Sequence, residues 1–338
     1  TALTYLFTRN VTKALSILMV DYSCALKLSM PLSVLSAINE AGTYSATVKG
    51  GKYMEAIAEA DTIVFDKTGT LTKAEPTVKQ VVSFNGLGED ELLRIAACLE
   101  EHFPHSMAKA VVGAARNKNL VHEEMHSKVE YIVAHGISSQ IEGRKVIIGS
   151  YHFVFEDEKC IIPDDKKELF DGLPDEYSRL YMAIENELAA VICIEDPIRE
   201  EAADIIKKLK EAGIKKAVMM TGDSERTAKA VAAKIGVDND SPALSAADVG
   251  IAISDGAELA REIADVTVEG NDLYELVALK HISNALMKRI HKNYRMIMGI
   301  NSTLIVLGVA GIIPPTTSAL LHNTSTIAIS LKSLEKLI

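Results

Sequence analysis

The stretch TIVFDKTGTLTK, Thr62 to Lys73, places a carboxylate, Asp66, at the end of a short run of hydrophobic residues. Such a run is typical of a buried strand, and a carboxylate at its tip can attack phosphorus to form an aspartyl phosphate. Lys67 can offset the charge of a phosphoryl group, and the backbone amides of Thr68 and Gly69 can cradle its oxygens. The stretch therefore predicts a phosphorylation site with Asp66 as the nucleophile.

The residue two places after Asp66 indicates how long an aspartyl phosphate at Asp66 would persist before hydrolysis. Soluble phosphatases with a related strand end carry a second Asp there, which acts as general acid and base. Here the position holds Thr68, which cannot transfer protons in that way. We therefore expect the intermediate to hydrolyse slowly without help and to drive another process, which argues against a soluble phosphatase.

The sequence between residues 55 and 279 has the pattern of an α/β protein. Apolar runs such as TIVFD, AAVICIED, KAVMMTGD and VGIAIS are short, as in fully buried parallel strands. Helical patterns such as REEAADIIKKLKEAG, which ends at Gly213, alternate with them. This alternation predicts a doubly wound sheet, whose ligands bind beyond the carboxyl ends of its strands. Three of the runs end in Asp66, Asp196 and Asp223.

The composition limits the classes of function. The chain has 338 residues and a formal net charge of −10, which suggests two or more domains and argues against a nucleic-acid partner. We expect no obligate protein partner either. The cysteines form no CxxC pair, which indicates reduced thiols rather than a disulfide framework. They are Cys24, Cys98, Cys160 and Cys193.

Three stretches are apolar enough to lie in a bilayer, where a spanning helix needs about 20 mostly apolar residues. They are residues 13–38, 296–313 and, more weakly, 317–338. A basic cluster, MKRIHKNYR at 287–295, precedes the second stretch and favours the cytoplasmic side of the membrane. The alternative is that the three stretches are buried core helices of a soluble protein.

These motifs resemble those of the P-type ATPases, the ion pumps that cycle through an aspartyl phosphate. DKTGTLT at 66–72 is similar to the family signature, and TGD at 221–223 and DPIREEA at 196–202 resemble its phosphorylation-domain loops. The resemblance implies that Asp196 belongs to a hinge beside the site. The catalytic residues that it implies are Asp66, Lys67, Thr68, Thr221, Gly222, Asp223 and Asp240.

The resemblance also implies an architecture. We expect a doubly wound α/β phosphorylation domain of the haloacid dehalogenase-like type, with an inserted α+β nucleotide-binding domain and flanking transmembrane helices. We find no counterpart of the family's actuator domain or earlier membrane helices. The expected boundaries are 1–45 and 281–338 for the membrane helices, 46–73 and 196–280 for the phosphorylation domain, and 74–195 for the insert.

One stretch of the expected insert, CLEEHFPHSMAKAVV at 98–112, resembles the His-Pro signature of the heavy-metal-transporting subfamily. The match implies that His105 contacts the adenine of ATP and that Glu100 is a second nucleotide contact. An imidazole can stack on a purine or hydrogen-bond to it. The sequence departs from the subfamily at Ser106, where Pro is expected, and Pro104 lies on the other side of the histidine.

A second stretch of the insert, IVAHGISSQIEGRKVIIGS at 132–150, resembles the glycine loop of the same subfamily. The match implies that Gly136 and Gly149 let the backbone approach the nucleotide closely. Ala134 stands where the first glycine is expected, and Ser150 stands where the subfamily has Asn.

The order of the family motifs is interrupted after Asp238. The family has a further strand and helix there, then a strand that ends in Gly-Asp-Gly-x-Asn-Asp, of which only Asn239 and Asp240 match. The resemblance implies ATP and Mg²⁺ as cofactors, with Mg²⁺ held by Asp66, Thr68 and Asp240. Because a sheet without a central strand loses backbone pairing, we expect that the printed sequence omits residues of the natural chain here. The alternative is a truncated, inactive pump-like protein.

The apolar stretch at 13–38 also carries residues that we expect to bind a transported ion. The subfamily usually has Cys-Pro-Cys there, whereas this chain has Tyr22-Ser23-Cys24 and a single thiolate. One soft ligand weakens the case for Cu⁺, and a mixed set of oxygen, nitrogen and sulfur favours Zn²⁺, Mn²⁺ or Cd²⁺. The candidate ligands are Asp21, Cys24, Asn301, His322 and Asn323.

Structural roles are the alternative for several of these ligands. His322 and Asn323 can join helices through hydrogen bonds alone, and Asp21 can pair with Lys27. The sequence as a whole predicts a multi-pass protein of the cell membrane with cytoplasmic catalytic domains. It would use ATP to export a divalent transition-metal or similar cation. A Cu⁺ exporter and a regulatory membrane subunit with an inactive ATPase fold are the other readings.

Overall fold

The computed structural model describes residues 1–101, 105–120, 130–132, 136–141, 143–221, 225–238, 247–253, 262–268 and 272–338. The chain divides into two compact units, each of which is described by itself. The first unit contains residues 1–62, 207–215 and 245–338, and the second contains residues 63–206 and 216–244.

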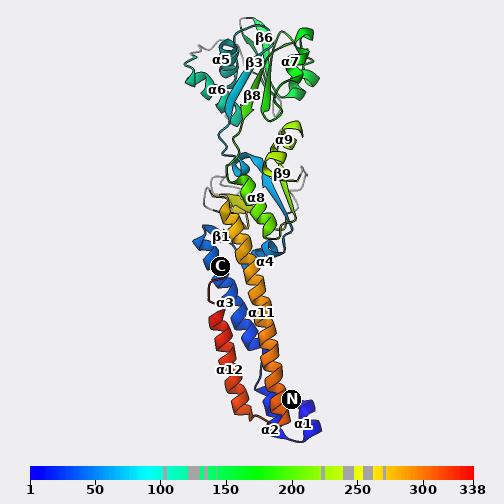
Figure 1. Cartoon of the computed structure of the whole chain (residues 1–338), viewed down its shortest axis with the longest axis vertical. Helices are drawn as coiled ribbons and strands as arrows, with labels where there is room; N and C mark the ends of the chain where they lie inside the picture. Colours follow the sequence, from blue (N-terminus) through cyan, green and yellow to red (C-terminus); the bar gives the residue numbers. More distant parts are fainter. Residues whose placement is uncertain are drawn as a thin grey trace. The chain divides into compact units, whose positions relative to one another are not determined.

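Helices dominate the first unit (Figure 1). Three long helices lie side by side and pack against one another: α3 (Tyr22–Thr43), α11 (Tyr274–Ala310) and α12 (Pro315–Lys332). Three shorter helices accompany them: α1 (Ala2–Thr8), α2 (Val11–Leu18) and α4 (Gly51–Glu59). Among the described residues, one helical segment, Val11–Thr43, is long and apolar enough to cross a membrane. The other two stretches expected to do so overlap α11 and α12, which are described in full and do not meet this criterion of length and apolar character.

Local sequence signals explain where the long helices end. The Asp272 side chain accepts a hydrogen bond of 2.9 Å from the backbone N–H of Tyr274, at the start of α11. α11 stops at Gly311, whose φ of 79° is a left-handed conformation that glycine adopts without strain. Pro315 then opens α12 at a position where its missing N–H costs no hydrogen bond.

A small sheet completes the first unit. β11 (Val266–Val268) is its central strand, with β1 (Ala46–Val48) antiparallel on one side and β10 (Ile251–Ile253) parallel on the other. Val266 and Val268 are buried, as their alternation along the strand predicts.

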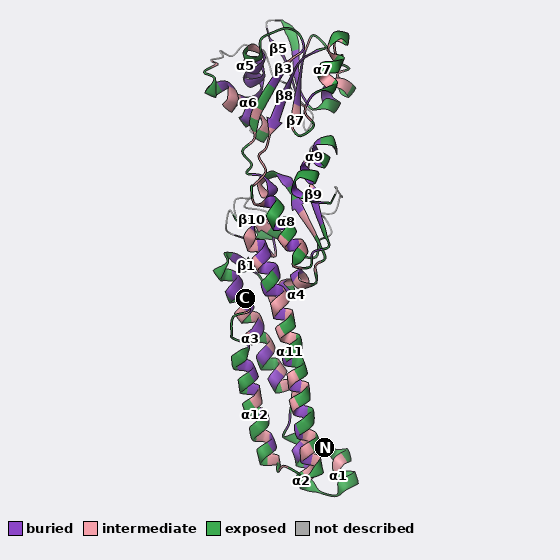
Figure 2. Cartoon of the chain, in the orientation of Figure 1, coloured by how far each residue is buried: buried purple, intermediate pink, exposed green. Residues whose placement is uncertain are grey.

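The second unit contains a six-stranded antiparallel sheet with the strand order β3-β8-β7-β6-β5-β4. Its strands are β3 (Thr77–Ser83), β4 (Glu130–Ile132), β5 (Gly136–Ile141), β6 (Arg144–Gly149), β7 (Ser178–Ile184) and β8 (Glu187–Glu195). Figure 2 shows that the central strands of this sheet are largely buried. All of them come from the region expected to form the inserted nucleotide-binding domain.

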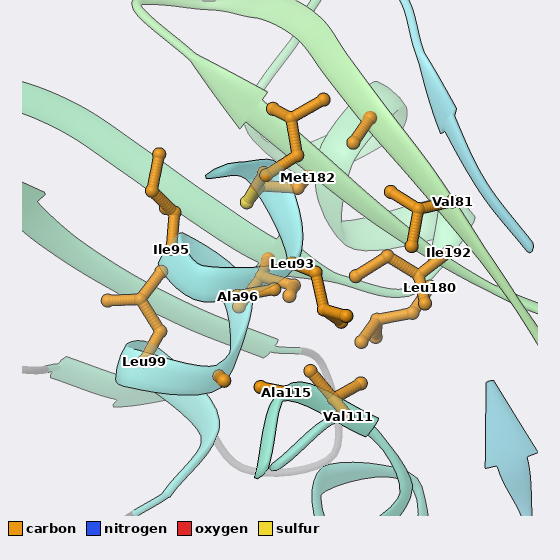
Figure 3. Packing of buried hydrophobic residues seen from close by; sticks show 14 of the residues in the cluster. Val81, Leu93, Ile95, Ala96, Leu99, Val111, Ala115, Leu180, Met182 and Ile192 are labelled. Carbon is orange, nitrogen blue, oxygen red and sulfur yellow. The ribbon is translucent and has the colours of Figure 1, made fainter. Parts of the chain in front are cut away.

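Both faces of this sheet are covered. α5 (Glu89–Glu100) and α6 (Ser106–Asn117) pack on one face, where Leu93, Leu99 and Val111 meet Met182 and Ile192 (Figure 3). Alternate residues of the same strands face a second, aromatic-rich cluster that includes Tyr181 and Phe153. α7 (Lys167–Asp171) adds Phe170 to that cluster. The strands are therefore apolar on both faces although the sheet is antiparallel.

This packing corrects one prediction. The run AAVICIED was expected to be a parallel strand of the doubly wound sheet, but it forms most of β8, which is antiparallel to both β3 and β7. A continuous apolar run reports burial on two faces, and it does not report the direction of the neighbouring strands. Asp196 follows β8, and its side chain contacts the phosphorylation loop through a hydrogen bond from Thr72.

The remaining strands of the second unit carry the phosphorylation loop. β2 (Thr62–Asp66) pairs with β9 (Lys216–Met220), and Val218 forms a parallel bridge with Asp238. α8 (Ala202–Glu211) and α9 (Glu225–Ile235) flank β9 in the sequence. Within the described residues, the apolar runs expected to form one sheet are thus divided among the β2-β9 pair, the six-stranded sheet that contains β8, and the β1-β11-β10 sheet that contains β10.

We expect the contact between α2 and α11 to depend on a glycine. A Cβ atom added to Gly308 would lie 2.6 Å from the Cβ of Ser16, closer than two carbon atoms can approach. Gly308→Ala should lower the free energy of unfolding by about 1–3 kcal/mol, because a methyl group overpacks this crossing. Thermal unfolding of the purified full-length protein in detergent measures the effect.

Gly299→Ala is the matched control, because Gly299 lies on the same helix and a Cβ there would meet nothing within 4 Å. Alanine is the better helix former, so this variant should be neutral or slightly more stable. Equal shifts in the melting temperature of the two variants would contradict the close packing at Gly308.

Candidate functional site

The candidate nucleophile Asp66 ends β2 and is exposed to solvent. The next five residues, Lys67–Leu71, form a kinked turn in which the backbone angles of Thr68 and Gly69 are not helical. Gly69 has a φ of 79° within it, a left-handed conformation that a side chain would strain. The backbone therefore turns sharply right after the carboxylate, which leaves the carboxylate accessible to a phosphoryl donor.

Two opposing effects act on the Asp66 carboxylate. Partial burial by the surrounding protein raises its pKa, whereas the backbone N–H groups of Lys67 and Thr68 and the Lys67 charge lower it. Amides that stabilise a carboxylate in this way are also placed to donate hydrogen bonds to phosphoryl oxygens. Lys67 is 6% exposed and Thr68 is exposed, so the loop buries its cation beside an open carboxylate.

A hydrogen bond from Thr72 closes the loop. Its hydroxyl donates to Oδ2 of Asp196 over 2.6 Å and accepts the backbone N–H of Gly69 over 3.1 Å. The backbones on either side are also paired, because the Lys73 N–H donates to the Pro197 carbonyl and the Arg199 N–H to the Leu71 carbonyl. Asp196 thus lies beside the site, where the resemblance placed a hinge. Thr72 is the last residue of the DKTGTLT motif, and sequence reasoning did not assign it this structural role.

The described residues include only part of the expected catalytic set. Thr221 directly follows β9, the strand that pairs with β2. Gly222, Asp223 and Asp240 lie outside the described residues. Their roles remain predictions from the sequence.

Glu100 and His105, the two expected nucleotide contacts, lie together. Glu100 ends α5 and is 2% exposed, and its Oε2 is 3.1 Å from Nε2 of His105. His105 caps the start of α6, where its Nδ1 accepts the backbone N–H of Ala108 over 3.2 Å. A neutral ring with its proton on Nε2 satisfies both contacts. The Glu100 carboxylate raises the pKa of His105.

Gly136 and Gly149 are directly opposite each other on β5 and β6. The space at Gly136 is small, because a Cβ there would lie 2.4 Å from the ring of Phe153 and 2.5 Å from the Ile148 carbonyl oxygen. Ser150, which stands where Asn was expected, accepts the backbone N–H of Phe153 through its hydroxyl. Ala134 lies outside the described residues.

The candidate transport residues of the first unit are partly assembled. α2 and α3 are separate helices, and the break between them is capped by Asp21, whose Oδ1 accepts the Ser23 N–H over 2.8 Å. Asp21 Oδ2 accepts the Cys24 thiol over 3.1 Å, and this described part of the chain contains no Asp21–Lys27 ion pair. Asp21 thus caps the start of α3 two residues before Ser23, which stands where the subfamily has proline.

Asn301 and His322 meet inside the helix bundle. Asn301 Oδ1 is 3.0 Å from His322 Nδ1, both side chains are buried, and the Asn301 amide nitrogen has no hydrogen-bond partner. Tyr22 bonds to Ser302 over 2.9 Å, which brings the start of α3 next to Asn301 in α11. Asn323 is exposed and does not join them. The described residues hold no cluster of three or more His, Cys, Asp or Glu side chains that could bind a metal ion.

An aspartate that ends a strand and is followed by a tight loop is typical of one class of hydrolases. The sequence model of this class, "haloacid dehalogenase-like hydrolase", matches residues 60–272. The chain belongs to the haloacid dehalogenase-like hydrolases. This result confirms the fold class expected from the strand pattern and the motifs.

Within that family, the relatives of this chain are heavy-metal P-type ATPases. The zinc-exporting P-type ATPase of Mycobacterium marinum is 31% identical over 97% of this chain and 49% of its own length. The manganese-exporting P-type ATPase of Mycobacterium leprae is 30% identical over 97% of this chain and 50% of its own length. Silver- and copper-transporting ATPases also match. The resemblance to the heavy-metal subfamily is confirmed.

The solved structures agree. A zinc-transporting PIB-type ATPase in the E2.Pi state has a TM-score of 0.70 and 26% identity, and the match covers 92% of this chain and 55% of that one. The chain spans about half the length of the curated relatives that it matches. The alignments run over 363 positions although the chain has 338 residues, so the relatives carry residues inside the matched region that this sequence lacks.

The packing at Gly136 predicts that the fold itself requires this glycine, in addition to the nucleotide contact expected from the sequence. Gly136→Ala should lower the melting temperature of the full-length protein without ATP, because the new methyl group collides with Phe153 and the Ile148 carbonyl. A loss of about 1–3 kcal/mol is expected for such overpacking. Thermal unfolding with and without ATP measures both effects.

Gly113→Ala is the control, since a Cβ at Gly113 in α6 meets nothing within 4 Å. It should leave the melting temperature unchanged or raise it slightly. If Gly136→Ala instead weakened only ATP binding and left the unliganded protein as stable as before, Gly136 would serve the ligand alone.

Proposed function

We propose that this protein is part of an ATP-driven exporter of a transition-metal or similar divalent cation, with an aspartyl-phosphate intermediate at Asp66. The observation that carries the proposal is the geometry of the Asp66 loop. An exposed carboxylate is followed by two backbone amides that act on it, by the left-handed Gly69 and by Thr68 in place of a second acid. Such a loop can accept a phosphoryl group on the carboxylate. It lacks the Asp two residues later that would transfer protons during hydrolysis of the aspartyl phosphate.

The residues present fit a magnesium ion at this loop. Mg²⁺ binds hard oxygen ligands and usually one or two carboxylates, and Asp66 offers an exposed carboxylate with exposed Thr68 beside it. In this proposal Asp66 and Thr68 hold the ion together with Asp240. The ion would offset the negative charge of the transferred phosphoryl group. Lys67, Thr221, Gly222 and Asp223 orient that group.

We assign the ATP site to Glu100, His105, Gly136 and Gly149. Because both ring nitrogens of His105 already have protein partners, the free surface of the imidazole is its face. We therefore infer that His105 stacks on the adenine and does not hydrogen-bond to it. The side chain is 44% exposed, which leaves room for a stacked base.

The helices of the first unit support a place in a lipid bilayer. Large apolar side chains are exposed on α11 and α12, among them Val306, Leu320, Ile327 and Leu331. Figure 2 shows exposed residues along the outer faces of these helices. Extended apolar surface of this kind needs lipid or another apolar partner. We propose a multi-pass membrane protein whose basic cluster at 287–295 and catalytic domains face the cytoplasm.

For the transported ion we propose a site between α3, α11 and α12. The contact between Asn301 and His322 and the bond between Tyr22 and Ser302 support it, because they bring the start of α3 close to Asn301. Cys24, Asp21 and Asn323 are the further candidate ligands. Zn²⁺, Mn²⁺ and Cd²⁺ suit this mixed donor set better than Cu⁺, which favours several sulfur ligands.

A truncated, inactive pump-like protein is the second candidate. The interruption of the family motifs after Asp238 favours it, because only Asn239 and Asp240 match the expected Gly-Asp-Gly-x-Asn-Asp. A Cu⁺ exporter is the alternative for the cargo. The two experiments below separate these candidates from the main proposal.

Asp66→Asn should abolish the acid-stable phosphoenzyme formed from γ-labelled ATP and leave ATP binding intact, because the amide cannot act as the nucleophile. The label incorporated by the full-length protein and its affinity for ATP are measured in parallel. Asp164→Asn, at an exposed aspartate outside the loop, should incorporate label like the unsubstituted protein. Label in the Asp66→Asn variant would refute the assignment, and no label in any form would favour the inactive protein.

Zn²⁺, Mn²⁺, Cd²⁺ or Co²⁺ should stimulate ATP hydrolysis more than Cu⁺ does. Cys24→Ala and His322→Ala should each raise the metal concentration needed for half-maximal stimulation by at least about tenfold, the size of one lost ligand at about 1.4 kcal/mol. Ser325→Ala, at a hydroxyl that bonds only back to the His322 carbonyl, serves as the control on α12. Stimulation by Cu⁺ alone would exclude the divalent cargo, and an unchanged metal profile would remove the substituted residue from the site.

A further inference from the structure

Lys280 is an unusual residue in the first unit. It lies on α11 and is 3% exposed, although lysine is rarely buried without a carboxylate partner. Burial lowers its pKa, and the nearby charge of Asp61 acts in the opposite direction. The surrounding sequence, ELVALKHISNAL, shows the signal in retrospect: Lys280 occupies the apolar phase of the helix, one place after buried Leu279.

The Lys280 ammonium group has three backbone partners at the end of α4. Its Nζ donates to the carbonyl oxygens of Ile57, Ala58 and Ala60 over 2.8, 2.9 and 2.9 Å. The last carbonyls of a helix have no partner within that helix and carry its negative partial charge. Three N–H groups on three carbonyls use the full donor capacity of a protonated lysine.

The same stretch of α11 makes other contacts around this point. The Ser283 hydroxyl lies 3.7 Å from the sulfur of Met54 in α4. The Asn284 side chain donates to the Ala212 carbonyl over 2.9 Å. The Lys215 N–H donates to the Asp61 carbonyl over 2.7 Å, which holds the residue that follows α4. The end of α4 is thus attached to α11, and the attachment centres on one cation.

Lys280 joins α4 and α11. The chain runs from α4 to the candidate nucleophile, and α11 carries part of the candidate transport site. The chain leaves α4 at Ala60 and continues directly into β2, which ends at Asp66. In the other direction α11 runs on from Lys280 to Asn301, a rise of about 32 Å at about 1.5 Å per residue. A continuous helix and a short strand therefore connect the candidate nucleophile and the candidate transport site through Lys280.

Burying an ammonium group between two helices costs desolvation free energy. Apolar residues of similar volume often replace buried ionic groups with no loss of stability. The cation makes the attachment specific, because it holds three carbonyls in one position and no apolar side chain can do so. Because β2 begins two residues after Ala60, a displacement of β2 can be passed to the end of α4 and through these bonds to α11.

We propose that Lys280 is a positioning residue that couples phosphorylation at Asp66 to the state of the transport site on α11. The inference rests on the proposed function and deepens it. Removal of the ammonium should leave both sites able to work and should weaken the influence of each on the other. Coupling between two binding sites is reciprocal and ordinarily amounts to about 5–150-fold.

The test measures the phosphoenzyme formed from labelled inorganic phosphate, with and without saturating Zn²⁺, in the full-length protein. In the unsubstituted protein, Zn²⁺ should change the phosphoenzyme level by at least about fivefold. In Lys280→Met, the phosphoenzyme should still form without Zn²⁺, and the effect of Zn²⁺ should fall below about twofold. Zn²⁺ binding and the melting temperature are measured on the same samples, because simple destabilisation would lower both phosphoenzyme levels alike.

Lys288→Met is the matched control, since Lys288 is exposed on the same helix. It should retain the full effect of Zn²⁺. Lys280→Arg carries the test if the Met variant does not fold. Arginine keeps the charge, but its planar fork does not match three converging carbonyls, so the effect of Zn²⁺ should fall by at least about twofold.

The outcomes separate this inference from the function on which it rests. A folded Lys280→Met protein with the full effect of Zn²⁺ would overturn the role of Lys280 alone, as would an unchanged effect in Lys280→Arg. Phosphoenzyme that is absent from the unsubstituted protein, or that persists in Asp66→Asn, would overturn the proposed function and this inference with it.

Discussion

The hydrogen bond from Thr72 to Asp196 is the constraint on which the second unit depends. It joins two segments that are 124 residues apart in the sequence, at the point where the chain enters and leaves the inserted sheet. The same hydroxyl accepts the Gly69 N–H and so fixes the turn that follows Asp66. One buried threonine therefore shapes the phosphorylation loop and anchors the domain expected to deliver ATP.

The first unit uses buried polar groups in a comparable way. Lys280 holds the end of α4, and Asn301 meets His322 between α11 and α12. At the far end of α12, Glu40 accepts the backbone N–H groups of Leu337 and Ile338. Each contact gives a partner to at least one buried polar side-chain atom, and each fixes a helix against another part of the unit. Long helices joined at a few polar points can transmit a displacement along their length.

The sequence predicted the parts whose function depends on neighbouring residues. The candidate nucleophile Asp66 and the glycine pair of the insert follow from short motifs, and the structure places Glu100 beside His105. The sequence did not predict that AAVICIED would be an antiparallel strand, because an apolar run indicates burial and does not indicate strand direction. Nor did it predict that Asp21 would cap α3, since a capping carboxylate and an ion-pairing one look alike in a sequence.

The sequence by itself determined which chemical groups are present: a carboxylate at the end of an apolar run without a second Asp two residues on, a single cysteine in an apolar stretch, and helices with identifiable ends. These depend on residue type and local spacing, which the order of the residues contains. Only the tertiary structure decided which distant groups meet: Thr72 with Asp196, Asn301 with His322, and Lys280 with the end of α4. Such contacts depend on how whole helices and strands pack, because a side chain reaches only a few ångströms and many residues of the same type could fill the same role.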